Sequence, residues 1–192
     1  MTALTLNIHN AIELTDERFE QICQSNRDLR FERTSTGKLV VMSPAGSDAG
    51  RQNCEVSGQL WLWNRQVRLG VSFDSSAGFT LSNGAIRSPN TSWIKQERWD
   101  TLNVSQKRKF APICPDFVVE LCSPSDRLID VQTKMQEYLN NGTRLGWLID
   151  PESKSAQIYR QNQRVEVQNA PNSLSGEDIL PGFELDLQEI WA

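Results

Sequence analysis

Hydrophobic and polar residues follow two periods along the chain, and each period predicts one kind of element. The longest helical pattern covers residues 48–69, and Gly70 is expected to end that helix. A second helix is expected over residues 125–141, with its apolar side chains on one face and Gly142 placed to stop it. A shorter helix is expected over residues 15–26, because Thr15 is a good N-cap and two acidic residues follow it.

Segments in which apolar and polar residues alternate predict the strands. These segments are a hairpin at 30–42 that turns at Thr36 and Gly37, short pieces at 71–76, 78–81 and 85–94, strands at 115–121 and 145–150, and a hairpin at 156–168; a tail at 182–191 follows them. Antiparallel strands followed by a strand, a helix and a strand indicate an α/β (α+β) fold, in which helices flank a mixed sheet. The length of 192 residues favours a single domain over 1–192.

Composition narrows the classes of function only slightly. The formal net charge is −4, so the whole chain offers no bulk attraction to the phosphates of nucleic acid, and any such contact must come from a local patch or a metal ion. The four cysteines, Cys23, Cys54, Cys114 and Cys122, are far apart, and His9 is the only histidine, which argues against zinc. No apolar run has the length of a membrane span, so we expect a reduced, cytoplasmic protein without membrane contact.

The strand at 115–121 carries the first candidate for chemistry. Glu120 lies near the end of this apolar strand, and strand alternation puts it on the face opposite Phe117, Val119 and Leu121. Burying a carboxylate costs about several kcal/mol of folding free energy in lost hydration, unless a partner binds the charge. In the helix that follows, Lys134 lies on the flank of the apolar stripe and can fold back onto the strand end. Glu120 and Lys134 therefore form a candidate pair.

Two more residues have the chemistry of ligands for a hard cation. Glu55 is a polar group on the helix at 48–69, and Asn90 follows Pro89, which holds the chain extended. Mg²⁺ prefers oxygen ligands and is bound by a few carboxylates, carbonyls and water. A neighbouring lysine could then offset the charge of a phosphate and assist the attacking water.

Each of these residues also has a simpler interpretation. Glu120 and Lys134 could form a structural ion pair, Glu55 could be a solvated helix residue, and Asn90 could be a turn residue. Asp130 is expected to pair with Lys134 by its i to i+4 spacing on the helix.

Three segments give the chain a resemblance to a known family. RSPN at 87–90, the stretch from PDFVVEL to LGWLIDP at 115–151, and LSGEDILPGFELDL at 174–187 resemble the Uma-type endonucleases, a branch of the PD-(D/E)XK, restriction-endonuclease-like superfamily. The resemblance extends over about residues 14–191. It implies a restriction-endonuclease-like core with an N-terminal helix and β-hairpin as additions, and a Mg²⁺ (or Mn²⁺) site at one edge of the sheet.

The resemblance also assigns roles by position. Glu55 matches the helix acid, Asn90 the acid of the PD motif and Glu120 the acid of (D/E)XK, while the main-chain carbonyl of Leu121 would be a further metal ligand. The lysine expected two residues after Glu120 is Cys122 here, and its role is expected to lie with Lys134.

Asn90 is the departure from the family pattern, because a neutral amide offers a metal only one carbonyl oxygen. Three classes of function stay open. The first is a Mg²⁺-dependent endonuclease that hydrolyses phosphodiester bonds of nucleic acid, with DNA the expected substrate and a homodimer the expected state. The second is a catalytically inactive nuclease-fold protein that binds nucleic acid or acts as an assembly or regulatory partner. The third is a structural protein without nucleic-acid contact.

Overall fold

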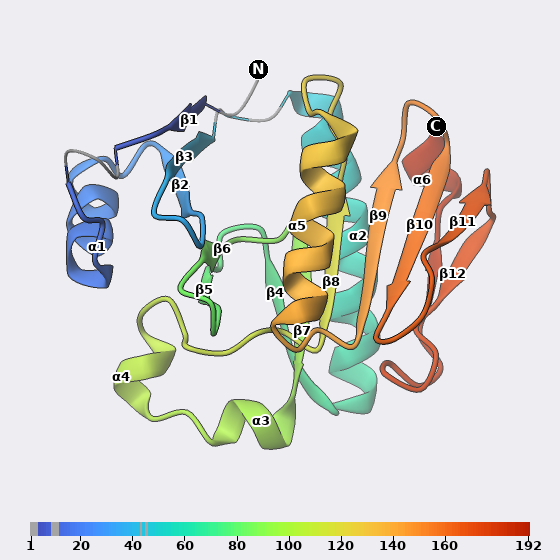
Figure 1. Ribbon diagram of the computed structural model, residues 1–192. Helices are drawn as coiled ribbons and strands as arrows, with labels where there is room; N and C mark the ends of the chain where they lie inside the picture. The colour runs from blue at the N-terminus through green and yellow to red at the C-terminus, as the bar shows by residue number, and fades with distance from the viewer. Residues whose placement is uncertain (1–3, 9–11, 43, 45) are drawn as a thin grey trace.

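The computed structural model describes residues 4–8, 12–42, 44 and 46–192 (Figure 1). Its larger sheet has six strands. In spatial order these are β11 (Glu166–Asn169), β10 (Ser155–Arg160), β9 (Leu145–Asp150), β8 (Phe117–Leu121), β7 (Thr91–Lys95) and β4 (Gly70–Asp74). β8 and β9 are parallel, and helix α5 (Leu128–Asn140) connects them, while the other neighbours pair antiparallel.

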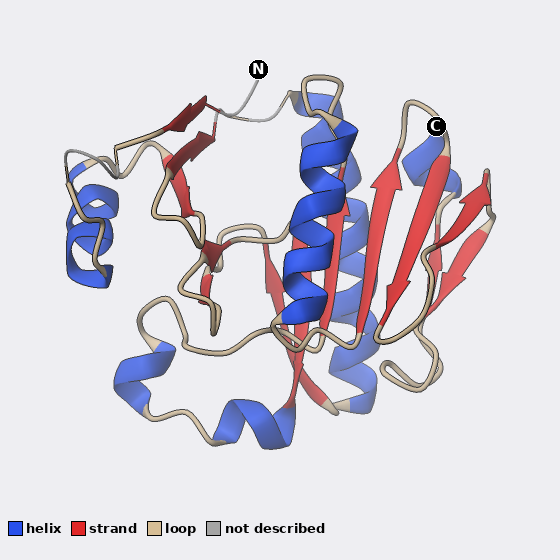
Figure 2. Cartoon of the chain, in the orientation of Figure 1, coloured by secondary structure: helices blue, strands red, loops and turns tan. Residues whose placement is uncertain are grey.

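Two long helices cover opposite faces of this sheet, α5 on one and α2 (Ser47–Val67) on the other (Figure 2). Phe117 and Val119 of β8 pack in the same core as Val56 and Leu60 of α2. Val118, between them, packs with Met135 of α5. Because side chains alternate along a strand, Glu120 shares the α5 face with Val118.

The N-terminal part forms a second sheet beside the first, with helix α1 (Asp16–Ser25) packed on it (Figure 1). Its five strands, in spatial order, are β1 (Leu4–Leu6), β3 (Leu39–Met42), β2 (Arg30–Arg33), β6 (Ile86–Arg87) and β5 (Phe79–Thr80). Three residues separate the end of β6 at Arg87 from the start of β7 at Thr91, so the chain passes directly from the second sheet into the first.

The remaining elements are short. They are α3 (Gln96–Asp100), α4 (Val104–Lys107), the paired strands β12 (Ser173–Ser175) and β13 (Glu184–Asp186), and α6 (Gln188–Trp191). None of the described helices is long and apolar enough to cross a lipid bilayer.

The predicted fold class is confirmed, and most predicted elements are present at or near their expected bounds. Two boundaries were wrong. Helix α2 ends at Val67, where Arg68 takes a left-handed conformation with φ of 56°, and Gly70 instead opens β4. Helix α5 begins at Leu128 rather than at 125, because Asp126 binds the N–H and hydroxyl of Ser123 and so closes a turn before the helix.

Gly142 has the predicted role, since its φ of 114° lies in the region that only glycine adopts easily, just past the end of α5. The N-terminal hairpin is more than an addition. Through β5 and β6 it becomes part of a sheet that lies beside the face covered by α5.

Candidate active site

Glu120 and Lys134 form the pair that the sequence predicts. Lys134 Nζ lies 2.8 Å from Glu120 Oε1, and the Tyr138 hydroxyl donates to the same oxygen at 3.0 Å. Only 8% of the Glu120 side chain is exposed. Lys134 and Tyr138 are four residues apart on α5, so one face of this helix presents both donors to the end of β8. Both donors use Oε1, which leaves Oε2 of Glu120 without a hydrogen bond from any of the described residues.

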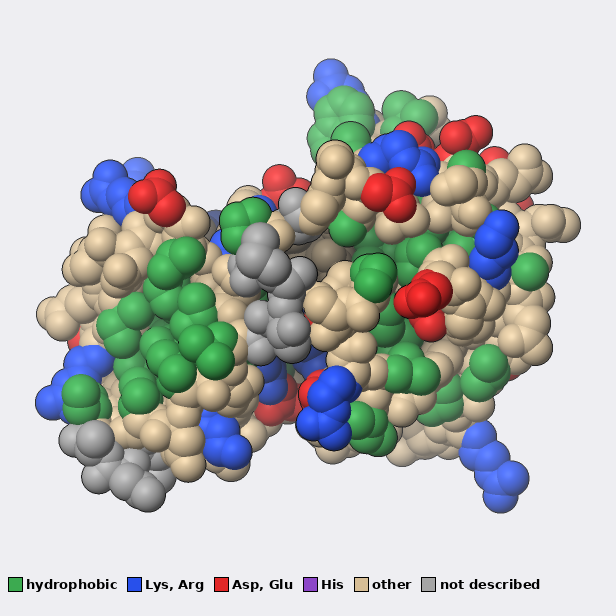
Figure 3. Space-filling view, turned by 90° about the horizontal axis from the view of Figure 1, so that it is seen from above, with side chains coloured by type: hydrophobic (Ala, Val, Ile, Leu, Met, Phe, Trp, Pro, Cys, Tyr) green, Lys and Arg blue, Asp and Glu red, His purple; other side chains and the backbone are tan. Residues whose placement is uncertain are grey.

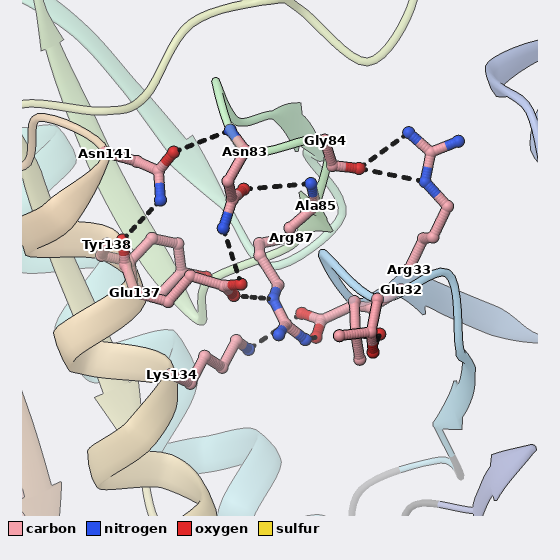
Figure 4. A network of polar contacts seen from close by, with 12 residues as sticks. Glu32, Arg33, Asn83, Gly84, Ala85, Arg87, Lys134, Glu137, Tyr138 and Asn141 are labelled. Carbon is pink, nitrogen blue, oxygen red and sulfur yellow. Dashed lines mark hydrogen bonds and ion pairs between the residues drawn. The ribbon is translucent and has the colours of Figure 1, made fainter. Parts of the chain in front are cut away.

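A second carboxylate, which sequence reasoning missed, lies on the other side of Lys134. Glu32 of β2 places Oε1 2.8 Å from Lys134 Nζ, and only 4% of its side chain is exposed. Its Oε2 accepts from Arg87 of β6 at 3.0 Å. Arg87 in turn donates to Glu137 of α5 at 2.6 Å (Figure 4). The network therefore joins the two sheets through buried ion pairs.

The charges of this network shift the pKa values of its members. Burial raises the pKa of Glu120, and Lys134 only partly offsets that effect. Burial acts the same way on Glu32, but Lys134 and Arg87 together outweigh it and lower its pKa. Burial would lower the pKa of Lys134, whereas Glu120 and Glu32 raise it overall. Lys134 is therefore an ammonium ion at neutral pH, which can donate hydrogen bonds but cannot accept a proton.

Asn90 lies beside the end of β8. Thr91 pairs with Val119, so the antiparallel register continues to Asn90 opposite Glu120. The side-chain oxygen of Asn90 accepts a hydrogen bond from the Leu121 N–H at 3.0 Å. The structure thus brings Asn90, Glu120, Leu121 and Lys134 together, as the sequence predicts.

Glu55 is not joined to this group by any hydrogen bond or ion pair among the described residues. It belongs to α2, on the opposite face of the sheet from α5, and its neighbour Val56 is in the core. Two residues further on, the Ser57 hydroxyl contacts the Thr91 hydroxyl at 2.5 Å, so α2 does pass close to the segment of Asn90. The role of Glu55 as a ligand stays a prediction.

The end of β8 offers only a sparse set of oxygen ligands to a divalent ion. Within the described part of the chain, no three acidic, histidine or cysteine side chains cluster as a metal site would require. The available donors are instead the free Oε2 of Glu120 and the amide oxygen of Asn90. Mg²⁺ is commonly held by one or two carboxylates and several waters, which is compatible with such a sparse set.

Three neighbouring residues differ from sequence expectation or have structural roles. Asp130 pairs with Arg127 at 3.7 Å and not with Lys134, because Lys134 is turned toward the two glutamates. Asp116 binds the Lys95 N–H and Arg98, and so holds the opposite end of β8. Burial, Asp150, Asp126 and Glu120 raise the pKa of Cys122 to about 12, so the thiol stays neutral. His9 lies outside the described residues.

Comparison with known proteins gives the family of the chain. The family model of Uma2, described as "Putative restriction endonuclease", matches residues 16–188. The chain belongs to the Uma2 family. No curated protein matches it. The description of the Uma2 family supports a nuclease-like protein that acts on nucleic acid. Restriction-endonuclease-like families generally use a divalent metal ion.

A solved structure is similar in fold. It is the crystal structure of a protein from Anabaena variabilis described as "a putative nuclease belonging to DUF820", with a TM-score of 0.70 and 21% identity, covering 84% of this chain and 89% of the other. At this identity the likeness concerns the fold alone. It shows that most of this fold is shared with that protein.

Proposed function

We propose that the protein is a metal-dependent endonuclease that hydrolyses phosphodiester bonds of nucleic acid, with DNA as substrate and Mg²⁺ (or Mn²⁺) as the ion. The observation that supports this most is the Glu120–Lys134 pair of 2.8 Å, which lies at the carboxyl end of a strand next to Asn90. A charged lysine beside a carboxylate with a free oxygen offers one group for a phosphate and one for a cation.

Each residue would act in a defined way. Oε2 of Glu120, the amide oxygen of Asn90 and the carbonyl of Leu121 would hold the cation, with Glu55 as a further acid from α2. The cation, when bound, would supply Lewis-acid stabilisation of the charge that develops on the phosphate. The Lys134 ammonium would donate to a phosphate oxygen or orient the attacking water. Tyr138 would keep Glu120 turned toward the site.

The same site supports a second candidate, an inactive nuclease-fold protein that binds nucleic acid or a partner. The observation in its favour is Asn90, a neutral amide whose oxygen is already bonded to the Leu121 N–H. With Glu120 as the one carboxylate nearest the strand end, the site could bind a cation too weakly for catalysis.

The test is a titration of Mg²⁺ and Mn²⁺ by calorimetry into the purified protein, with plasmid cleavage measured on the same samples. Wild type is compared with Glu120→Gln, Glu55→Gln and Asn90→Asp. The nuclease proposal expects metal binding and nicking by wild type and the loss of both in Glu120→Gln. If wild type does neither and Asn90→Asp gains both, the inactive candidate is supported. If neither wild type nor Asn90→Asp binds metal or nicks DNA, both the metal site and the nuclease function are refuted.

Nucleases that cut both strands commonly use two sites, and a second copy of the chain is the simplest source of the second. The proposed state is therefore a homodimer. Light scattering coupled to size-exclusion chromatography, with and without a DNA duplex, tests it.

A further inference from the structure

Lys134 is held from two sides, and the two sides come from different sheets. Glu120 Oε1 and Glu32 Oε1 each lie 2.8 Å from its Nζ. Glu120 belongs to the strand that carries the proposed site, whereas Glu32 comes from β2, more than eighty residues earlier in the chain. The ammonium has only three N–H donors, so two of them are directed by these carboxylates.

Glu32 also fixes the segment that carries Asn90. Its Oε1 accepts from the Ser88 N–H at 2.9 Å, and its Oε2 binds Arg87 at 3.0 Å. Asn90 follows Ser88 by two residues and bonds to Leu121. One buried carboxylate therefore contacts both the lysine and the start of the Asn90 segment.

The surrounding contacts hold Glu32 itself in one place. The guanidinium of the next residue, Arg33, donates to the Leu14 and Gly84 carbonyls and to Asp16. Arg87 is fastened to Glu137, which also accepts from Asn83 (Figure 4). Seen from above, the molecule is hollowed between its N-terminal part and the rest, and charged side chains of both signs lie at this hollow (Figure 3).

We propose that Glu32 is a positioning residue of the active site, which aims the Lys134 ammonium and locks the Ser88–Asn90 segment against β8. The inference rests on the proposed nuclease function. It makes the N-terminal sheet a part of the site. With Glu120 engaged in holding a cation, Glu32 would remain as the counter-ion that keeps Lys134 beside the phosphate.

The alternative is that Glu32 only stabilises the packing of the two sheets. The variant Glu32→Gln separates the two roles, because it keeps a side chain of the same size with an acceptor oxygen but removes the charge. Glu137→Gln is the matched control, since it removes the other carboxylate bound to Arg87, and within the described part of the chain Glu137 forms no ion pair with Lys134.

Two readouts are needed. The first is steady-state plasmid nicking with saturating Mn²⁺. The wild-type protein is the background for this assay, or Asn90→Asp if wild type does not cleave and Asn90→Asp does. Glu32→Gln is expected to lower kcat about tenfold or more, as a misplaced catalytic group does, with KM for DNA nearly unchanged. The second readout is the NMR signal of the Lys134 side-chain Cε methylene, assigned from its absence in Lys134→Arg. Glu32→Gln is expected to move it more than Glu137→Gln does.

The outcomes are distinct. If Glu32→Gln has the same kcat as the protein without this substitution, the inference is overturned, whether or not the Lys134 signal moves. An unmoved Lys134 signal in Glu32→Gln would overturn it as well. If neither wild type nor Asn90→Asp cleaves DNA with Mn²⁺, the proposed function fails first and the positioning role falls with it. Glu32→Ala, compared by urea unfolding, reports the structural share of the contact separately.

Discussion

The amide oxygen of Asn90 accepts a hydrogen bond from the Leu121 N–H at 3.0 Å, across the ends of β7 and β8. An aspartate could make the same bond, since only an acceptor oxygen is required. The neutral residue therefore preserves the local structure while it removes one negative charge from beside Glu120. At position 90, the charge can therefore be changed without loss of the hydrogen bond to Leu121.

Asn90→Asp is expected to bind Mn²⁺ about tenfold more tightly than wild type, or roughly 1.4 kcal/mol. The reason is that a second carboxylate joins Glu120 at the strand ends, where a charge close to the cation acts through a reduced dielectric. Calorimetric titration measures the change. The control is Asn162→Asp, which adds the same charge in an exposed turn with φ of 58°. Equal affinity in the two variants would mean that residue 90 is not a ligand.

Lys134→Met is expected to destabilise the protein by about 3 kcal/mol at pH 7, because it leaves two buried carboxylates without their shared cation. Urea unfolding followed by tryptophan fluorescence measures the loss. In Lys38→Met, an exposed lysine without a side-chain partner among the described residues, the change should stay within about 0.5 kcal/mol. A loss as small as that of the control would argue that the network contributes little to stability.

The Glu120–Lys134 pair could be predicted because a strand, a turn and a helix bring the two residues together locally. The position of Asn90 followed from the resemblance, and the register of β7 on β8 agrees with it. Glu32 could not be predicted in the same way, since its contact depends on how the N-terminal sheet lies against α5. The signal in the sequence is the pair of charged residues Glu32 and Arg33, which follow Phe31 within the same strand. The surroundings of the Glu55 side chain could not be predicted either. Helical spacing shows which residues share a face of the helix, but not which part of the protein that face contacts.

Gly70 is expected to be intolerant of any side chain, which is the reason for a glycine at the start of β4. A Cβ there would lie 2.5 Å from the Trp93 ring and nearer still to the Ile94 carbonyl oxygen. Gly70→Ala should cost about 3 kcal/mol or more by overpacking. Gly58→Ala is the matched control, because a Cβ at this mid-helix position meets nothing within 4 Å and should stabilise α2 by about 1 kcal/mol. Thermal or urea unfolding compares the pair, and a similar sign for both would contradict the packing of β4.

The stability contributed by Glu32 is expected to depend on pH in the acid range. Its pKa is lowered in the folded protein by Lys134 and Arg87, against the effect of burial. The unfolded chain therefore binds more protons below the ordinary glutamate value of 4.5, so this stabilisation is complete above that pH and is lost as the pH falls through the folded pKa. The difference in free energy of unfolding between wild type and Glu32→Gln should shrink from pH 6 toward pH 3. Glu152→Gln, at an exposed turn, provides the control, and a constant difference across the range would contradict a charged Glu32.

Cys122 lies two residues after Glu120, where the resemblance leads us to expect a lysine, and its chemistry argues that it does not take over that role. Burial, with Asp150, Asp126 and Glu120, raises its pKa to about 12, so at neutral pH it is a thiol with neither the positive charge of lysine nor the nucleophilicity of a thiolate. We expect a disulfide reagent at pH 8 to label one cysteine rapidly, the exposed Cys54, and to reach Cys122 only slowly. In Cys54→Ser the rapid phase should disappear, while Cys122→Ser should leave it unchanged. Rapid labelling that persists in Cys54→Ser and is lost in Cys122→Ser would show a reactive thiolate at the end of β8 and would contradict the raised pKa of Cys122.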